Sequence, residues 1–183
     1  GGATQPLFDP LPERLVYLDY RRWAFECAAL DLALRQAGTS LGEAVGREPR
    51  PITFVVSMSL GEPPSTERFR SWLGLYPGLR FKLDANSEWT EELVSELAET
   101  GAVDSIDFKG HYQGTTVDTP PDAVLYRRVA QGLPGAWLEE PALPAATTPG
   151  LEPHRDRGTW DASIHSVEYI EALHWPPRTV NVK

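Results

Sequence analysis

Apolar and polar residues alternate along five short stretches of the chain, and each stretch carries ionisable or amide side chains. The stretches cover residues 81–84, 106–109, 137–140, 160–162 and 180–183. Because successive strand residues point to opposite faces of a sheet, this alternation predicts five strands with one apolar and one polar face. A further strand is predicted over residues 52–60, with Ser57 and Ser59 on the polar side.

Helical segments, not hairpin turns, separate the predicted strands. Apolar residues at helical spacing occur within 65–73, 90–99 and 121–131, and again after Ser166. We expect Thr90 to cap one of these helices and Pro121 to open the next. Strands joined by such long connections run parallel, so the sequence predicts an α/β fold of repeated βα units.

The polar side of the predicted strands carries most of the candidate chemistry. Its members are Lys82, Asp84, Asp107, Lys109, Glu139, Asp161, Asn181 and Lys183. Parallel sheets are normally covered on both faces, and charges at strand C-termini are typical of the active site of a β/α barrel. We therefore expect a (β/α)8 TIM-type barrel, present as about six βα units of a longer, truncated protein. An open six-stranded sheet is the alternative, but its polar face would need another cover.

The first 50 residues have a different character. Residues 20–37 are predicted to form a helix whose apolar stripe comprises Trp23, Cys27, Leu30 and Leu34. Residues 49–51 read Pro-Arg-Pro and are typical of a boundary. We expect an N-terminal segment with a pre-barrel helix over 1–50 and a partial barrel, strands 1 to 6, over 51–183. Cys27 is the only cysteine, so no internal disulfide can form, and we expect it to be buried.

Composition excludes some classes of function. The 183 residues carry a net charge of −9, which argues against nucleic-acid binding. The chain contains no run of 18 apolar residues, so we expect no membrane span. No charged-then-apolar leader opens it, which favours a cytoplasmic setting. We expect a small-molecule partner and a homo-oligomer when the protein is intact.

Three carboxylates on successive predicted strands indicate a metal site. Asp107, Glu139 and Asp161 share the polar side near one end, where their charges would repel and raise each other's pKa. A divalent cation relieves this repulsion, and an all-oxygen ligand set indicates Mg²⁺ over Zn²⁺. Lys82 and Lys183 would flank these acids, and a lysine beside a metal can act as a base.

This combination suits one chemistry. A lysine base removes a proton next to a substrate carboxylate, and the metal holds the enediolate that forms. Mutual neutralisation of acids and lysines is the structural alternative, but desolvation offsets the stability that interior ion pairs provide. Glu140 should point away from the acids by parity. His111 and His165 continue the polar side into loops, and His165 is a candidate substrate contact.

The motifs at these positions resemble the enolase superfamily, in the branch of mandelate racemase, muconate cycloisomerase and o-succinylbenzoate synthase. The similarity covers residues from about 20 to 183, and the segments that carry it are residues 23–33, Leu138-Glu139-Glu140-Pro141, Trp160-Asp161-Ala162-Ser163 and Val180-Asn181-Val182-Lys183. It implies that Asp107, Glu139 and Asp161 bind Mg²⁺. It also implies that Lys183 is a base or a cation that stabilises the intermediate, with Lys82 opposite.

The chain departs from that family's pattern at three positions. Asp84 stands where the second strand usually has a second lysine, Lys109 replaces an asparagine, and Ala162 replaces a glutamate. Asp84-Ala85-Asn86 also imitates the third-strand motif, but strand counting selects Asp107. These changes favour a one-base elimination, or altered or lost chemistry, over a two-lysine racemisation.

The resulting hypothesis is a Mg²⁺-dependent lyase or isomerase acting on a carboxylate substrate. Asp84, Lys109, Asn181 and His165 are candidates to contact the substrate or to support the metal ligands. A non-catalytic enolase-superfamily relative that keeps the barrel, with or without the metal, is the first alternative. A glycosidase with paired carboxylates is the second, and the inward lysines argue against it.

Overall fold

The computed structural model describes residues 18–110, 119–162, 164 and 166–181, which divide into two compact units between Ile52 and Thr53. The first unit contains helices α1 (Leu18–Ala37) and α2 (Leu41–Ala44). At the start of α2, the hydroxyl of Ser40 accepts the N–H of Glu43, whose carboxylate accepts the N–H of Ser40. This reciprocal capping box explains why so short a helix forms.

The apolar residues of α1 lie on its surface. Trp23 and Leu30 are each 47% exposed, and Cys27 is exposed as well. The prediction that Cys27 is buried is therefore wrong. In the described part of the first unit, the other helix is α2. With only four residues, it is too short to cover the apolar stripe of the twenty-residue helix α1.

The second unit is built on a parallel sheet, which has six strands in the described part of the chain. The strands are β1 (Val55–Ser59), β2 (Arg80–Asp84), β3 (Val103–Asp107), β4 (Trp137–Glu139), β5 (Gly158–Trp160) and β6 (Thr179–Val180). Each strand pairs in parallel with the next one along the chain. A strand is found at each predicted place, but the bounds differ: β3, β5 and β6 begin and end earlier in the chain than their alternating stretches, and β1 is shorter than predicted.

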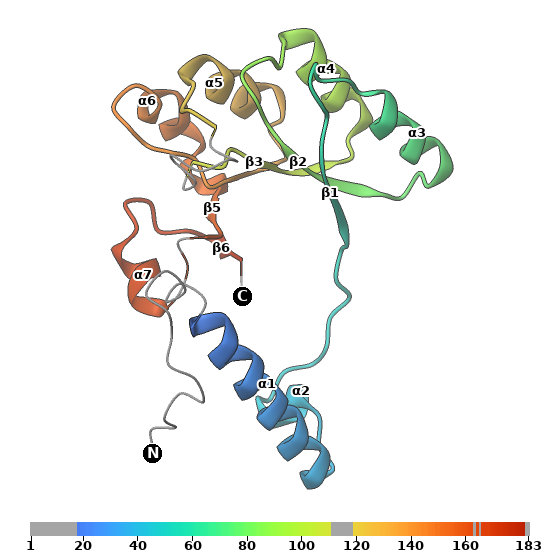
Figure 1. Cartoon of the computed structure of the whole chain (residues 1–183), viewed down its shortest axis with the longest axis vertical. Coiled ribbons are helices and arrows are strands. Elements are labelled where there is room, and N and C mark those ends of the chain that lie inside the picture. The colour runs from blue at the N-terminus through green and yellow to red at the C-terminus, as the bar shows by residue number, and fades with distance from the viewer. Residues whose placement is uncertain (1–17, 111–118, 163, 165, 182–183) are drawn as a thin grey trace. The chain divides into compact units, whose positions relative to one another are not determined.

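Helices follow the strands as predicted. They are α3 (Glu67–Leu75), α4 (Glu91–Thr100), α5 (Ala123–Gly132), α6 (Thr148–Leu151), the 3₁₀ helix η2 (Glu152–Arg157) and α7 (Val167–Ala172). In Figure 1, α3, α4, α5 and α6 lie along the same side of the strands. Right-handed crossovers that advance steadily in one direction place the helices on one face. The described residues therefore form an α/β fold of βα units.

Side-chain caps fix the helix ends. Thr90 Oγ1 accepts the N–H of Leu93, and α4 stops at Gly101, which has a left-handed φ of 61°. The prediction that Pro121 is the first helical residue is wrong, because Asp122 is the N-cap of α5. Its carboxylate accepts the N–H groups of Val124 and Leu125, so the helix begins after the prolines.

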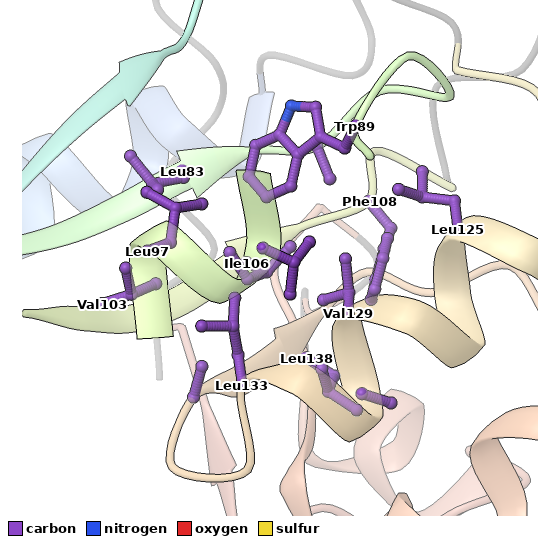
Figure 2. Packing of buried hydrophobic residues seen from close by; sticks show 14 of the residues in the cluster. Leu83, Trp89, Leu97, Val103, Ile106, Phe108, Leu125, Val129, Leu133 and Leu138 are labelled. Atoms are coloured by element: carbon purple, nitrogen blue, oxygen red, sulfur yellow. The ribbon is translucent and has the colours of Figure 1, made fainter. Parts of the chain in front are cut away.

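A hydrophobic core lies between the sheet and its helices. Figure 2 shows the contributions of the strands and of the segments around α4 and α5: Leu83, Trp89, Leu97, Val103, Ile106, Phe108, Leu125, Val129, Leu133 and Leu138. The apolar parity of the predicted strands is thus confirmed at Leu83, Ile106 and Leu138. At α7, in contrast, Val167 is 65% exposed.

Strand register aligns the polar residues. Asp84 pairs with Asp107, Asp107 with Glu139, and Glu139 with Thr159. Asp84, Asp107 and Glu139 are each the last residue of their strand. Three carboxylates therefore occupy the same level at the C-terminal edge of three neighbouring strands. One strand, β3, separates Lys82 from Glu139, so strand counting identified Asp107 as the third-strand acid.

Candidate functional site

Lys82 links two buried carboxylates at this edge. Its Nζ atom lies 2.5 Å from Glu139 Oε1 and 3.3 Å from Asp107 Oδ2. The side chains of Asp107 and Glu139 are only 5% and 4% exposed, so water contributes little to their solvation. A buried carboxylate needs such a charged partner to remain ionised.

Lys109 forms a second bridge to Asp107, at the same oxygen that Lys82 contacts. Its Nζ atom lies 2.7 Å from Asp107 Oδ2 and 3.0 Å from Asp84 Oδ1. Its own backbone N–H donates to Asp107 Oδ1 at 2.9 Å. Lys109 therefore engages both oxygens of Asp107.

Glu139 has two further partners. Asn181 Nδ2 donates to Glu139 Oε1 at 2.9 Å, and Ser105 Oγ donates to Glu139 Oε2 at 3.3 Å. Together these contacts form a continuous chain of side chains across the sheet, which we call the acid–lysine row. Its members are Asp84, Lys109, Asp107, Lys82, Glu139 and Asn181. Ser105 was missed by the sequence analysis, although it shares the strand and parity of Asp107.

The electrostatics of the row follow from burial and surplus negative charge. Burial raises the pKa of Glu139, and the charges of Asp107 and Asp161 raise it further, although Lys82 acts in the opposite direction. Burial alone would lower the pKa of Lys82, but the hydrogen bond to Glu139 and the two acidic charges outweigh it and raise that pKa. The pKa of Lys109 is raised in the same way, against the effect of burial, by Asp107 and Asp84. Both lysines are thus held as ammonium groups.

Glu140 lies directly after β4 and supports the end of β5. It is buried, it has a left-handed φ of 48°, and its Oε1 accepts the N–H of Asp161 at 2.5 Å. A non-glycine residue in this region is strained, which is common where a site fixes a backbone. The alternating pattern predicted only that Glu140 points away from the acids. Alternation gives no information about a residue that leaves the strand conformation.

The ends of β3 and β4 are also held together by their backbones. The N–H of Gly110 donates to the carbonyl of Glu140 at 2.8 Å. A Cβ atom at position 110 would lie 2.6 Å from that carbonyl oxygen and still closer to the amide nitrogen of Ala142. Only glycine fits this approach, so Lys109 is followed by a fixed turn.

Among the predicted site residues, the described structure brings together Lys82, Asp84, Asp107, Lys109, Glu139 and Asn181 in the row. Asp161 lies near enough to Glu139 for its charge to raise the pKa of that group. Lys183 and His165, like His111, lie outside the described residues. The residues predicted to lie on the polar side of β2, β3 and β4 are therefore in contact with one another.

The donor chemistry of these acids suits Mg²⁺, because all three predicted ligands offer carboxylate oxygens. Within the described residues, however, no group of three His, Cys, Asp or Glu side chains is arranged to hold a metal ion. The ammonium of Lys82 lies against the oxygens of Asp107 and Glu139 that an ion would need. A divalent ion could bind these two acids only if Lys82 gave up one of its contacts.

No helix in the described part of the chain combines the length and the apolar character that a membrane crossing requires.

Comparisons with known proteins identify a family. Residues 3–44 match the N-terminal domain, and residues 48–183 the C-terminal domain, of a family described as a domain of unknown function (DUF8230). No curated protein and no solved structure matches the chain. Because the C-terminal match alone covers more than half of its length, the chain belongs to the DUF8230 family.

Proposed function

We propose that the second unit is part of a (β/α)8 barrel of the enolase-superfamily type, and that it acts as a Mg²⁺-dependent lyase or isomerase on a carboxylate substrate. The observation that carries this proposal is the contact of Lys82 with both Asp107 and Glu139. Acids and an amine from three neighbouring strands thereby meet at the C-terminal edge of a parallel sheet, where β/α barrels hold their active sites.

The order of the strands supports the barrel. Six strands in sequential order, all parallel in the described residues, are what the first six strands of such a barrel would give. An open doubly wound sheet, in contrast, reverses its strand order near the middle of the sheet.

The proposed roles follow from the charges of the row. Asp107, Glu139 and Asp161 would hold Mg²⁺, which when bound supplies positive charge to an enediolate. Lys82 carries a proton at Nζ, since its pKa is raised, and it is suited to orient a substrate carboxylate or to return a proton. We assign abstraction of the substrate proton to Lys183.

Solvent exchange tests this function. The intact protein with Mg²⁺ is incubated in D₂O with a panel of small carboxylates, and deuterium beside the carboxylate is followed by proton NMR. We expect exchange with at least one compound. The Lys183→Ala variant should lower that exchange by about 10²–10³-fold or more while Mg²⁺ stays bound. Near-normal exchange in this variant would refute the role of Lys183.

A non-catalytic relative is the second candidate. Asp84 and Lys109 form an ion pair, and Asp84 stands where the enolase superfamily, which the motifs resemble, usually has a second lysine; this observation favours loss of chemistry. Absence of exchange across the whole panel, together with binding of one or more of the carboxylates, would support this candidate over the enzyme.

A further inference from the structure

We infer that Lys109 limits the acid–lysine row to a single divalent ion, because its ammonium occupies the place between Asp84 and Asp107 where a second ion would bind. This inference rests on the proposed Mg²⁺ site and deepens it. It concerns the end of the row formed by β2 and β3, whereas the proposed ion lies toward Glu139.

The geometry of Lys109 is that of a bridging cation. Its Nζ atom lies within 3.0 Å of an oxygen from each of two carboxylates, Asp84 Oδ1 and Asp107 Oδ2. These two aspartates are register partners on neighbouring strands, so both offer oxygens at the same level. A divalent ion joining the two carboxylates would need the same position.

Lys109 is held in this place by its backbone. Its N–H is bound to Asp107 Oδ1, its φ is 55°, and the following Gly110 is packed against the backbone of Glu140 and Ala142. Because the backbone is fixed, only the side-chain torsions of Lys109 have to be ordered to place its ammonium between the two acids. The two ion pairs at Nζ hold it there.

The acids depend on this ammonium. Asp84 Oδ1 is shielded from solvent and has no hydrogen bond of good geometry in the described part of the chain, although the charge of Lys109 lies 3.0 Å away. Without Lys109, two adjacent carboxylates would share one edge and repel each other. Mg²⁺ and Mn²⁺ commonly bind through one or two carboxylates and complete their shells with water. Loss of the lysine should therefore create a second ion site.

The test is the number of Mn²⁺ ions bound, measured by electron paramagnetic resonance of free Mn²⁺ during titration of the intact protein. Wild type should bind one ion in the sheet, and Lys109→Met should bind two. Lys109→Gln should also bind two ions. This variant keeps a hydrogen-bond donor at position 109, so it can replace the Met variant in the test if that variant does not fold. Lys109→Arg, which restores the positive charge, should bind one.

Arg80→Met is the matched control. Arg80 Nε donates to Asp104 Oδ1 at 3.0 Å and joins the same two strands at the start of β2, away from the row. Its removal loosens the β2–β3 pair without freeing Asp84, so it should leave the number of ions unchanged. A gain of one ion in this variant would attribute the effect to loosening and overturn the inference.

The outcomes separate this inference from the proposed function. If wild type binds none and Lys109→Met binds one, the role of Lys109 holds while the proposed Mg²⁺ site fails. If wild type and both neutral variants bind one ion, the role of Lys109 is overturned and the Mg²⁺ site stands. If none of these proteins binds an ion, both are overturned.

Discussion

The ammonium of Lys82 on β2 lies 2.5 Å from Glu139 Oε1 on β4, although β3 runs between the two strands. Neighbouring strands are about 4.8 Å apart, so the backbones of β2 and β4 are separated by about twice that distance. The long lysine side chain crosses this gap and passes close to Asp107 on the way. Three strands are thereby tied together on the polar side of the sheet.

Replacement of Lys82 should be costly. In Lys82→Met, the buried carboxylates of Glu139 and Asp107 lose a shared cation, and breaking a buried pair in this way typically costs about 3–5 kcal/mol. We expect the free energy of unfolding, measured by urea denaturation at neutral pH, to fall by that amount. A loss below about 1 kcal/mol would show that the pair behaves like an exposed one.

A double variant tests the same contact independently of the residues around it. Glu139→Gln alone leaves the Lys82 ammonium with only Asp107, whereas Lys82→Met with Glu139→Gln removes both charges. The loss in the double variant should be smaller than the sum of the single losses by about 1 kcal/mol or more. Strict additivity would contradict direct coupling.

Alkaline pH should weaken the fold through the two lysines. Their pKa values in the folded protein are raised above the ordinary 10.5. A raised lysine pKa gives stability that is fully present below 10.5 and is lost as the pH rises through the folded value. Urea midpoints should therefore fall above about pH 10.5, and this slope should be shallower in Lys109→Met. Equal slopes in the two proteins would contradict the raised pKa of Lys109.

Tyr126 should ionise late in the same pH range. Burial raises the pKa of its phenol to about 12, and its oxygen accepts the N–H of Ala142 at 3.4 Å. Its contribution to stability is present below the ordinary value of 10 and is lost as the pH approaches 12. Ultraviolet titration should show a phenol that ionises after the exposed ones, and Tyr126→Phe should remove that step. A wild-type titration without a late step would count against burial of the phenol.

Gly110 should tolerate no side chain. In Gly110→Ala the new Cβ would meet the carbonyl of Glu140 at 2.6 Å and the backbone of Ala142, which cannot move without separating β3 from β4. We expect a loss of about 3 kcal/mol of unfolding free energy, at the upper end of overpacking effects. Gly135→Ala is the control, because a Cβ there has no heavy atom within 4 Å. Similar unfolding midpoints for the two variants would contradict the close approach.

The arrangement of the row could be predicted from the sequence because it depends on two simple periods. Alternation placed Lys82, Asp107 and Glu139 on one side, and helical connections required parallel strands that end at the same edge. Register then brings the three side chains together without any further information. The same reasoning could have included Ser105.

Other features could not be predicted, because they depend on local geometry or on what packs nearby. Lys109 and Glu140 have left-handed backbones, a conformation that their residue types do not favour. Alternation therefore gave no indication that Glu140 supports the backbone of Asp161. The exposure of Cys27 and Val167 likewise depends on which surfaces face their helices. Helical spacing shows which residues share an apolar face of a helix, but it does not show what packs against that face.

The exposed thiol of Cys27 gives the protein a ready point of attachment. As the chain's single cysteine, it can take one maleimide reagent at one position without any substitution. A nitroxide placed there, combined with Mn²⁺ at the proposed metal site, would form a pair of spins whose separation pulsed spectroscopy can measure. A label at Cys27 would thus allow the distance between the helical first unit and the carboxylates of the second unit to be measured.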